Sequence, residues 1–441
     1  MTAAVRAGLQ ARVSPLFRTR ADLVSWRNVR VYAEQAREGL GMLEDAAADD
    51  GPGPALPVVR KALTSTIAAC GRADDSNGEI QDVIAGLLAL HARLCREEPP
   101  PVAKLIEWML GFGFDRRRWH DFTLDPVDYA DALGPAGLDR YESALLELAA
   151  GVPAELGPED RQAAYRASLG DRQAREDDAW NAHLRFQLEH ALQRIAVARR
   201  DAGQVIARYA GDGSHGYRLL LAAEALVEID AIENAIDYAH RATHEGGIHA
   251  VRAGALWAGL LRQHHPEQEL PARQAVFARF PTSATAGPLH RVAVEQHVWA
   301  DLEPGVLEVL AGQVREVVVF LLFELHDPAR AFAVAVSGEL PHARWNDELW
   351  NELIDQQLLT DPTVVIPVIE QQVDQLLKIA DAHHYRLAAR RLRVLRRAAA
   401  AAGDAGHADT VIQQLRLRHK NRPRLQLEFD RAHLPPLARI P

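Results

Sequence analysis

The stretch Tyr217 to Ala242, YRLLLAAEALVEIDAIENAIDYAHRA, constrains the fold more than any other part of the chain. Small and branched apolar residues recur in it at three- and four-residue spacing on both sides of a short polar break. This spacing predicts a helix, a turn and a second helix, because it places apolar side chains on one face of each helix. Two later segments repeat this order. The matching positions are Leu226, Asp230 and Ala235, then Leu261, His265 and Leu270, then Leu322, His326 and Ala331.

The composition also favours helices. Only 6% of the 441 residues are aromatic, whereas Ala, Leu and Arg, which are good helix formers, are abundant. The chain is 48% hydrophobic and long enough to bury a large core. Short connections separate the predicted helices, so neighbouring helices should run antiparallel. We therefore predict an all-α, tetratricopeptide-like α-solenoid of antiparallel helical hairpins, preceded by an N-terminal helical domain.

Glycine and proline clusters predict where the helical pattern breaks. GPGPALP at residues 51–57 predicts a break before a helix at 58–70. AAGVPAELGPED at residues 149–160 predicts a domain boundary. The predicted organisation is an N-terminal helical domain at 1–155, a tetratricopeptide-like solenoid at 156–430 and a tail at 431–441.

No secretory signal or membrane span is predicted. The first twenty residues lack a long apolar core, and arginines interrupt them. The longest apolar run, VVVFLLF at residues 317–323, is too short to cross a bilayer, which needs about 20 residues, and predicts the inside of a buried helix. Cys70 and Cys95 are too few for a disulfide framework and are not spaced as a metal pair. We expect a cytoplasmic protein without a bound cofactor or metal.

The net charge of −10 hides a basic segment near the C-terminus. Residues 386–431 carry 12 Lys and Arg against 4 Asp and Glu, so the rest of the chain is strongly acidic. Such a segment predicts either a surface for an anionic partner or a pair of helices whose arginines face water or acidic neighbours. The candidate contacts to an anionic partner are Arg386, Arg390, Arg393, Arg397, Arg416, Arg418, Lys420, Arg422 and Arg424.

Aromatic residues supply two further candidates. Trp345 and Trp350 flank acidic residues in RWNDELWNEL, which fits either an exposed ridge that contacts a protein partner or an ordinary amphipathic helix. The passage from Trp108 to Tyr141 is dense in aromatic residues. It predicts the junction of packed helices, with a ligand pocket as the alternative.

Motifs that would indicate a known chemistry are incomplete. The loop Asp74 to Glu79 has Ala73 where a calcium loop needs an acidic first ligand, so it predicts a helix cap instead. His244 and His249 are five residues apart, whereas a zinc-protease helix places its two histidines four apart. Neither a Walker-type phosphate loop nor a dinucleotide glycine fingerprint is present in the sequence.

Several loose phrases carry a family resemblance. They are DDSNGEIQDV at 74–83, DYADALG at 128–134 followed by GLDRY, ARFPTS at 278–283, YRLAARRLRVLRR at 385–397 and LRLRHKNRPRL at 415–425. On these phrases the chain resembles the helical-repeat region that accompanies the SWIM zinc finger in actinobacterial proteins, together with stand-alone relatives. The resemblance implies a helical scaffold. It does not extend to zinc binding, because two distant cysteines cannot supply the four ligands of such a finger.

Three functional hypotheses follow. The leading one is a non-enzymatic scaffold or adaptor that receives another protein on the inner surface of residues 217–420. The second is a helical protein that binds the phosphate backbone of nucleic acid through the C-terminal arginines. The third is an enzyme whose site is assembled from distant residues, such as the aspartates and histidines of the aromatic passage.

Overall fold

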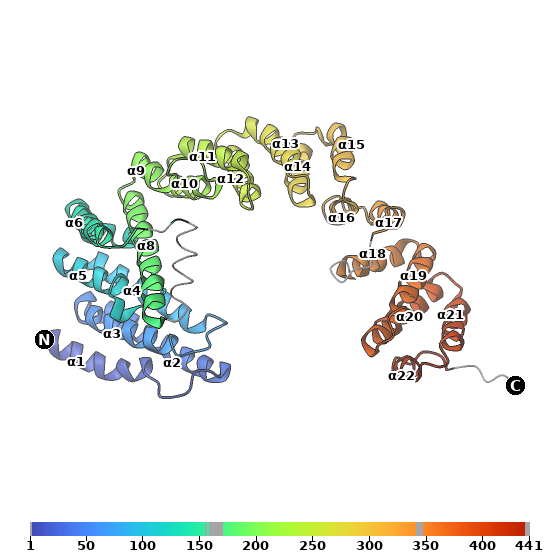
Figure 1. The fold of residues 1–441 in the computed structure, drawn as a ribbon, viewed down its shortest axis with the longest axis horizontal. Helices are drawn as coiled ribbons and strands as arrows, with labels where there is room; N and C mark the ends of the chain where they lie inside the picture. The colour runs from blue at the N-terminus through green and yellow to red at the C-terminus, as the bar shows by residue number, and fades with distance from the viewer. Residues whose placement is uncertain (1, 155–156, 158–170, 341–346, 437–441) are drawn as a thin grey trace. The chain divides into compact units, whose positions relative to one another are not determined.

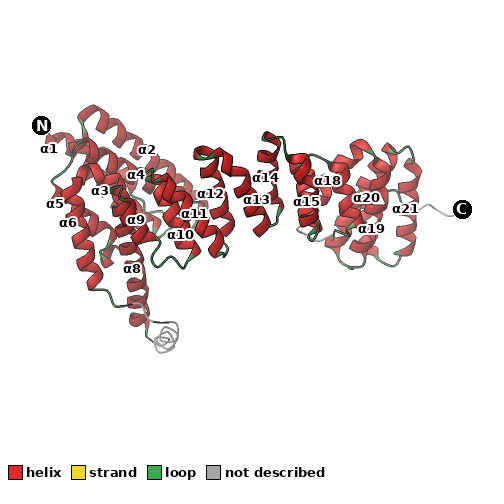
Figure 2. Ribbon diagram, turned by 90° about the horizontal axis from the view of Figure 1, so that it is seen from above, coloured by secondary structure: helices red, strands yellow, loops and turns green. Residues whose placement is uncertain are grey.

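A computed structural model describes residues 2–154, 157, 171–340 and 347–436 (Figures 1 and 2). In these residues all the regular structure is helical, as predicted for an all-α chain. Among the described residues before 250, the α-helices are α1 (Thr2–Val13), α2 (Trp26–Asp50), α3 (Pro52–Cys70), α4 (Glu79–Glu97), α5 (Val102–Gly113), α6 (Ala130–Ala150), α8 (Arg172–Ala198), α9 (Ala202–Tyr209), α10 (Gly216–Glu228) and α11 (Ile232–Glu245).

The remaining α-helices lie in residues 250–340 and 347–436. They are α12 (Ala250–His264), α13 (Glu269–Arg279), α14 (Ser283–Glu295), α15 (Trp299–Leu310), α16 (Val314–Val319), α17 (Pro328–Ser337), α18 (Asp347–Thr360), α19 (Val365–Leu377), α20 (Ala382–Ala401), α21 (Ala405–Arg418) and α22 (Pro423–Arg431). None of the described helices combines the length and the apolar content needed to cross a bilayer.

The chain divides into two compact units, residues 1–250 and 251–441. The N-terminal unit has two hydrophobic clusters, one among α1 to α4 and one among α4, α5, α6 and α8. Helix α4 contributes to both, since Leu87 lies in the first cluster and Cys95 in the second. The seam between the clusters therefore runs along α4.

The C-terminal unit is a sequence of packed helix pairs. Helix α14 packs against α13 and α15, α16 against α17, and α19 and α21 against α20. Three polar links between alternate helices each join residues 33 positions apart. They are Arg262 Nη2 to Glu295 Oε1 at 2.9 Å, the Ser283 amide to Glu316 Oε2 at 2.7 Å, and Arg291 Nη1 to Glu324 Oε2 at 2.7 Å.

Helix, turn and helix are present at all three places where the sequence predicts them. Asp230 (φ 65°) and His326 (φ 51°) adopt the left-handed conformation that ends many helices. The amide of Ala231 then donates to the Leu226 carbonyl at 2.9 Å, which closes the helix end. His265 differs, because its φ is negative (−140°) and it leads directly into a short 3₁₀ turn.

Helix α3 begins six residues before the predicted start at residue 58. Pro52 and Pro54 lie in its first turn, where amide groups have no acceptor within the helix, so the missing donors cost little. Pro57 is also accommodated inside the helix. The predicted break at residues 51–57 is therefore confined to Gly51, and the predicted helix start at residue 58 is wrong.

Two other local predictions are confirmed. The loop before α4 caps that helix, since the Asp75 carboxylate accepts from the amides of Ile80 at 3.1 Å and Gln81 at 3.0 Å. The apolar run at 317–323 is helical and largely buried, although it includes a π-helical turn from Phe320 to Glu324. Phe323 is its exposed member, at 51%.

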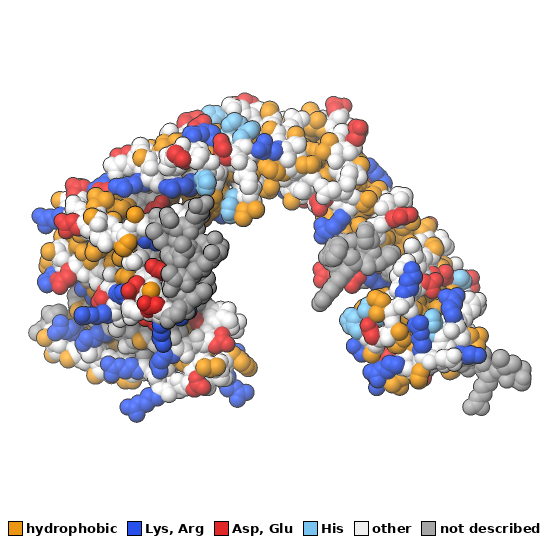
Figure 3. All heavy atoms as spheres, viewed as in Figure 1, with side chains coloured by type: hydrophobic (Ala, Val, Ile, Leu, Met, Phe, Trp, Pro, Cys, Tyr) orange, Lys and Arg blue, Asp and Glu red, His pale blue; other side chains and the backbone are white. Residues whose placement is uncertain are grey.

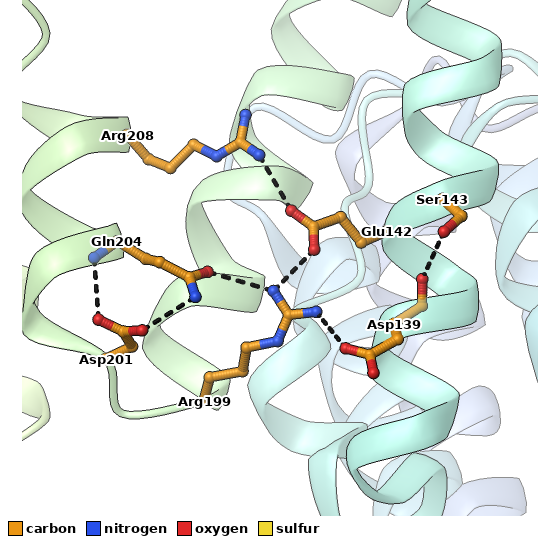
Figure 4. A network of polar contacts seen from close by, with 7 residues as sticks. All are labelled: Asp139, Glu142, Ser143, Arg199, Asp201, Gln204 and Arg208. Carbon is orange, nitrogen blue, oxygen red and sulfur yellow. Dashed lines mark hydrogen bonds and ion pairs between the residues drawn. The ribbon is translucent and has the colours of Figure 1, made fainter.

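A polar network joins α6 to α8 and α9 (Figure 4). Arg199, at the end of α8, donates to Glu142 and to Asp139, both at 2.7 Å, and Arg208 donates to Glu142 at 2.9 Å. These links connect helices on either side of residues 149–160, within the N-terminal unit. Residues 155–156 and 158–160 of that segment lie outside the described residues, as do residues 161–168, where the sequence also predicts a helix. The domain boundary proposed there stays a prediction.

Candidate binding pocket in the N-terminal unit

A pocket of about 800 Å³ lies between α3, the start of α4, α5 and the loop at residues 117–122. Arg60, Thr64, Ile67 and Gly71 line one wall. Their spacing of four, three and four residues places them on one face of α3. Small-molecule sites commonly have about this volume, and this pocket combines it with an aromatic wall and cationic side chains, so we take it as the candidate binding site.

Behind this wall, His91 of α4 is completely buried at the seam between the two clusters. Its Nε2 accepts from Arg60 Nε at 2.9 Å, and its Nδ1 lies 3.0 Å from the Tyr129 hydroxyl. Because the guanidinium can only donate, Nε2 must be unprotonated and Nδ1 carries the proton. The ring also stacks on Trp108, with centroids 3.8 Å apart. His91 therefore fixes α3, α5 and the start of α6 around α4.

His91, Cys95 and Tyr129 are held in their uncharged forms. Burial, with a smaller contribution from Arg60, lowers the pKa of His91 to about 3. Burial raises the pKa of the Cys95 thiol to about 11 and raises that of Tyr129 well above its usual range. Cys95 Sγ lies 3.8 Å from His91 Nδ1, but a neutral thiol beside a neutral imidazole is not an activated nucleophile.

The opposite wall is aromatic. Trp108 and Phe112 of α5 line it together with Trp119 and Phe122 of the loop. Trp119 is 45% exposed, yet its ring packs edge-on against Trp180 of α8, with centroids 5.7 Å apart. The aromatic passage thus supplies both interior packing and a partly exposed ring that is held in place.

The pocket also carries an excess of positive charge. Arg60, Arg72 and Arg117 line it, and none of them forms an ion pair with a described carboxylate. Arg60 lies over the Trp108 ring at 4.8 Å. The acidic lining residue, Asp121, has a side chain that is 97% exposed. Cations and aromatic faces together suit an anionic ligand that also has an aromatic or apolar group.

Arg416, in the basic segment predicted from sequence, is buried and bonds to other parts of the C-terminal unit. This side chain is only 2% exposed, and it donates to Gln426 at 2.9 Å, to Asp430 at 2.8 Å and to the Leu434 carbonyl at 3.3 Å. Its guanidinium also lies 5.5 Å from the centre of the Phe429 ring. Arg416 is therefore a buried structural residue, and the prediction that it contacts an anionic partner is wrong.

Five of the other candidates contact the protein itself. Arg397 pairs with Asp355 at 3.2 Å, Arg418 with Asp374 at 3.4 Å, Arg424 with Glu428 at 3.0 Å and Arg386 with Glu428 at 4.0 Å, while Arg422 donates to the Leu377 carbonyl at 2.8 Å. Arg390, Arg393 and Lys420 are exposed and form no ion pair with a described residue.

The acidic helices α18 and α19 offset much of this positive charge. Residues 347–436 carry 13 Lys and Arg against 12 Asp and Glu, because these two helices precede the basic segment. In Figure 3, basic and acidic side chains are interspersed over the C-terminal helices. The excess seen along the sequence is therefore largely compensated within the C-terminal unit.

The tryptophan candidates also need correction. Trp350 is 2% exposed and packs edge-on against Phe332, with centroids 6.4 Å apart. It is a core residue and is not accessible to a partner in this fold. Trp345 lies outside the described residues.

The pocket was only partly visible in the sequence. The stripe at Arg60, Thr64, Ile67 and Gly71 and the four-residue spacing of His91 and Cys95 are local signals of shared helix faces. The bond from His91 to Tyr129 joins residues 38 positions apart and has no local signal. Among the described residues, no group of three or more His, Cys, Asp or Glu side chains is placed to hold a metal ion.

A family model matches residues 2–258, and it is described as a family of unknown function, DUF6880. The matched residues include the whole pocket. The comparison with curated proteins gives no match. The resemblance to helical regions of SWIM-domain proteins stays a hypothesis, since the family match does not bear on it.

Proposed function

Because the chain belongs to the DUF6880 family, whose description names no activity, its function has to be argued from its own residues, and we propose a non-enzymatic protein-interaction scaffold. The scaffold is a tetratricopeptide-like array of helical hairpins in the C-terminal unit, joined to an N-terminal unit that holds a partner segment in its pocket.

The observation that carries the proposal is the 33-residue spacing of the polar links in the C-terminal unit. Arg262 to Glu295 and Arg291 to Glu324 join the first helices of successive hairpins at the same separation. Tetratricopeptide units repeat about every 34 residues, so contacts that span 33 residues between the first helices of neighbouring hairpins support stacking of similar units. Stacked hairpins present extended surfaces on which other proteins bind.

The pocket supports binding over catalysis. Its wall presents arginines and aromatic rings, which recognise a ligand, while the nearby His91 and Cys95 have pKa values far from neutrality. A general acid or base works best when its pKa lies near the working pH. The same cluster is well suited to holding the pocket walls at a fixed distance.

The proposal is tested with the full chain as bait in native lysate of the source cell. Each captured protein is then purified and titrated with the pure chain by calorimetry. We expect at least one protein to bind with a Kd below about 10 µM, which corresponds to roughly 7 kcal/mol of binding free energy. If no captured protein binds in pure form, the scaffold proposal is wrong.

The alternative function, nucleic-acid binding, is supported by the exposed, unpaired Arg390, Arg393 and Lys420. Under the scaffold proposal, fluorescence anisotropy with single- and double-stranded DNA and RNA should stay flat, because acidic helices offset the basic segment. Tight binding by the wild type would instead favour nucleic acid. In that case the variant R390E/R393E/K420E should show a shallower dependence of affinity on salt, by the amount expected for about three lost phosphate contacts. The control variant reverses the ion-paired Arg397, Arg418 and Arg424. Arg416 is left unchanged because it is buried.

A further inference from the structure

We infer that the pocket between α3 and the loop at 117–122 binds an acidic peptide segment that carries an aromatic side chain. This inference rests on the proposed function and specifies the chemistry of the partner. The charge of the pocket, its length along α3 and its aromatic wall support this ligand class.

The pocket contains arginines that have no ion-pair partner among the described residues. Many exposed arginines of the N-terminal unit pair with a nearby carboxylate, as Arg30 does with Glu34 at 2.9 Å. Arg72 and Arg117 are exposed and form no ion pair with a described residue, although both line the same pocket. Arg60 lies below them and is turned inward, since its Nε donates to His91 and its Nη2 is buried, so it adds positive charge beneath the pocket. Carboxylates of a ligand would provide partners for Arg72 and Arg117.

The length of the pocket wall along α3 favours a peptide over a compact anion. Arg60 and Arg72 lie toward opposite ends of the α3 wall. The ten residues from Arg60 to Cys70 rise about 15 Å along the helix, at 1.5 Å per residue. An extended peptide advances about 3.3 Å per residue, so five or six residues span this wall and can present acidic groups at both ends. The phosphates of a mononucleotide are shorter than this rise, so a peptide covers more of the wall.

The exposed ring of Trp119 favours a ligand that also carries an aromatic side chain. Trp119 keeps nearly half of its surface exposed while Trp180 and His183 hold its ring from behind, with centroids 5.7 and 5.6 Å away. A ring that is ordered in advance loses little entropy on binding, and tryptophan is frequent among residues that dominate binding energy. An aromatic side chain of the peptide would pack on this ring and on Phe122.

The experiment uses a phage-displayed library of random heptapeptides selected on the immobilised full chain. An enriched peptide is then synthesised without a label and titrated by calorimetry. We expect enrichment of Asp and Glu together with Phe, Trp or Tyr. The double variant R72E/R117E should weaken binding about a hundredfold, and Trp119→Ala about tenfold.

Matched controls separate the pocket from general surface effects. Arg140→Glu reverses an exposed arginine of α6, and Trp26→Ala removes a tryptophan of α2 that is 66% exposed; neither residue lines the pocket. Both should leave the Kd within about twofold. R72Q/R117Q removes the two charges without adding acidic ones and should weaken binding by an intermediate factor.

Three outcomes would overturn the inference. They are enrichment without an acidic preference, an acidic peptide whose affinity is unchanged in R72E/R117E, and displacement of the enriched peptide by micromolar AMP or ATP. In each case a captured protein that still binds the pure chain would leave the scaffold proposal standing. If the peptide binds as expected but no captured protein binds the pure chain, the scaffold proposal alone is overturned.

Discussion

Trp350→Ala is expected to lower the free energy of unfolding of the C-terminal unit by about 3–5 kcal/mol. The side chain is 2% exposed and belongs to a cluster that includes Leu353, Ile354 and Ile369. Removing the indole deletes a large apolar surface and leaves a cavity that a close-packed core closes only in part. Differential scanning calorimetry and urea unfolding of the full chain measure the change.

Trp26→Ala serves as the control for Trp350→Ala. Trp26 is 66% exposed at the start of α2, so its removal should change stability by less than about 0.5 kcal/mol. A similarly small effect of Trp350→Ala would contradict its burial and restore the exposed ridge that the sequence allowed. Hydrogen exchange of α17 to α20 would locate the destabilised region.

The error at Trp350 shows what a local pattern cannot decide. Buried Leu349, Trp350, Leu353 and Ile354 form a helical stripe that is visible in the sequence. Glu348, between the two tryptophans, is exposed on the opposite face and made an exposed ridge plausible. Burial depends on whether another helix covers the stripe, and here Phe332 of α17 contacts the indole ring.

The arginines around Arg416 show that a local pattern does not decide the surface charge either. Helices and many of their ends could be predicted because apolar spacing, proline and capping act over a few residues. Ion pairs join distant segments: Arg397 pairs with Asp355, 42 positions away, and Arg418 with Asp374, 44 positions away. Counting charges along residues 386–431 therefore overstated the positive surface. The pocket likewise joins segments that are distant in the sequence, since its walls come from residues 60–72 and 108–122.

His91 should make the N-terminal unit lose stability in mild acid. Its pKa is about 3 in the folded chain and near 6.5 when exposed, because burial disfavours the imidazolium. Between these values the unfolded state binds one more proton than the folded state, so stability rises with pH. Relative to pH 8, His91 alone should cost about 2 kcal/mol at pH 5.

The measurement compares urea unfolding of the wild type and His91→Gln between pH 8 and pH 5. Glutamine does not titrate, so the variant should be less stable than the wild type at pH 8, where it loses the stacking on Trp108, but should lose about 2 kcal/mol less on acidification. The comparison cancels the contributions of His120 and His190, whose pKa values burial also lowers. Equal losses in the two proteins would mean that His91 is protonated in the folded state. It could not then accept the hydrogen bond from Arg60, and the packing of α3 against α4 at the pocket wall would have to be different.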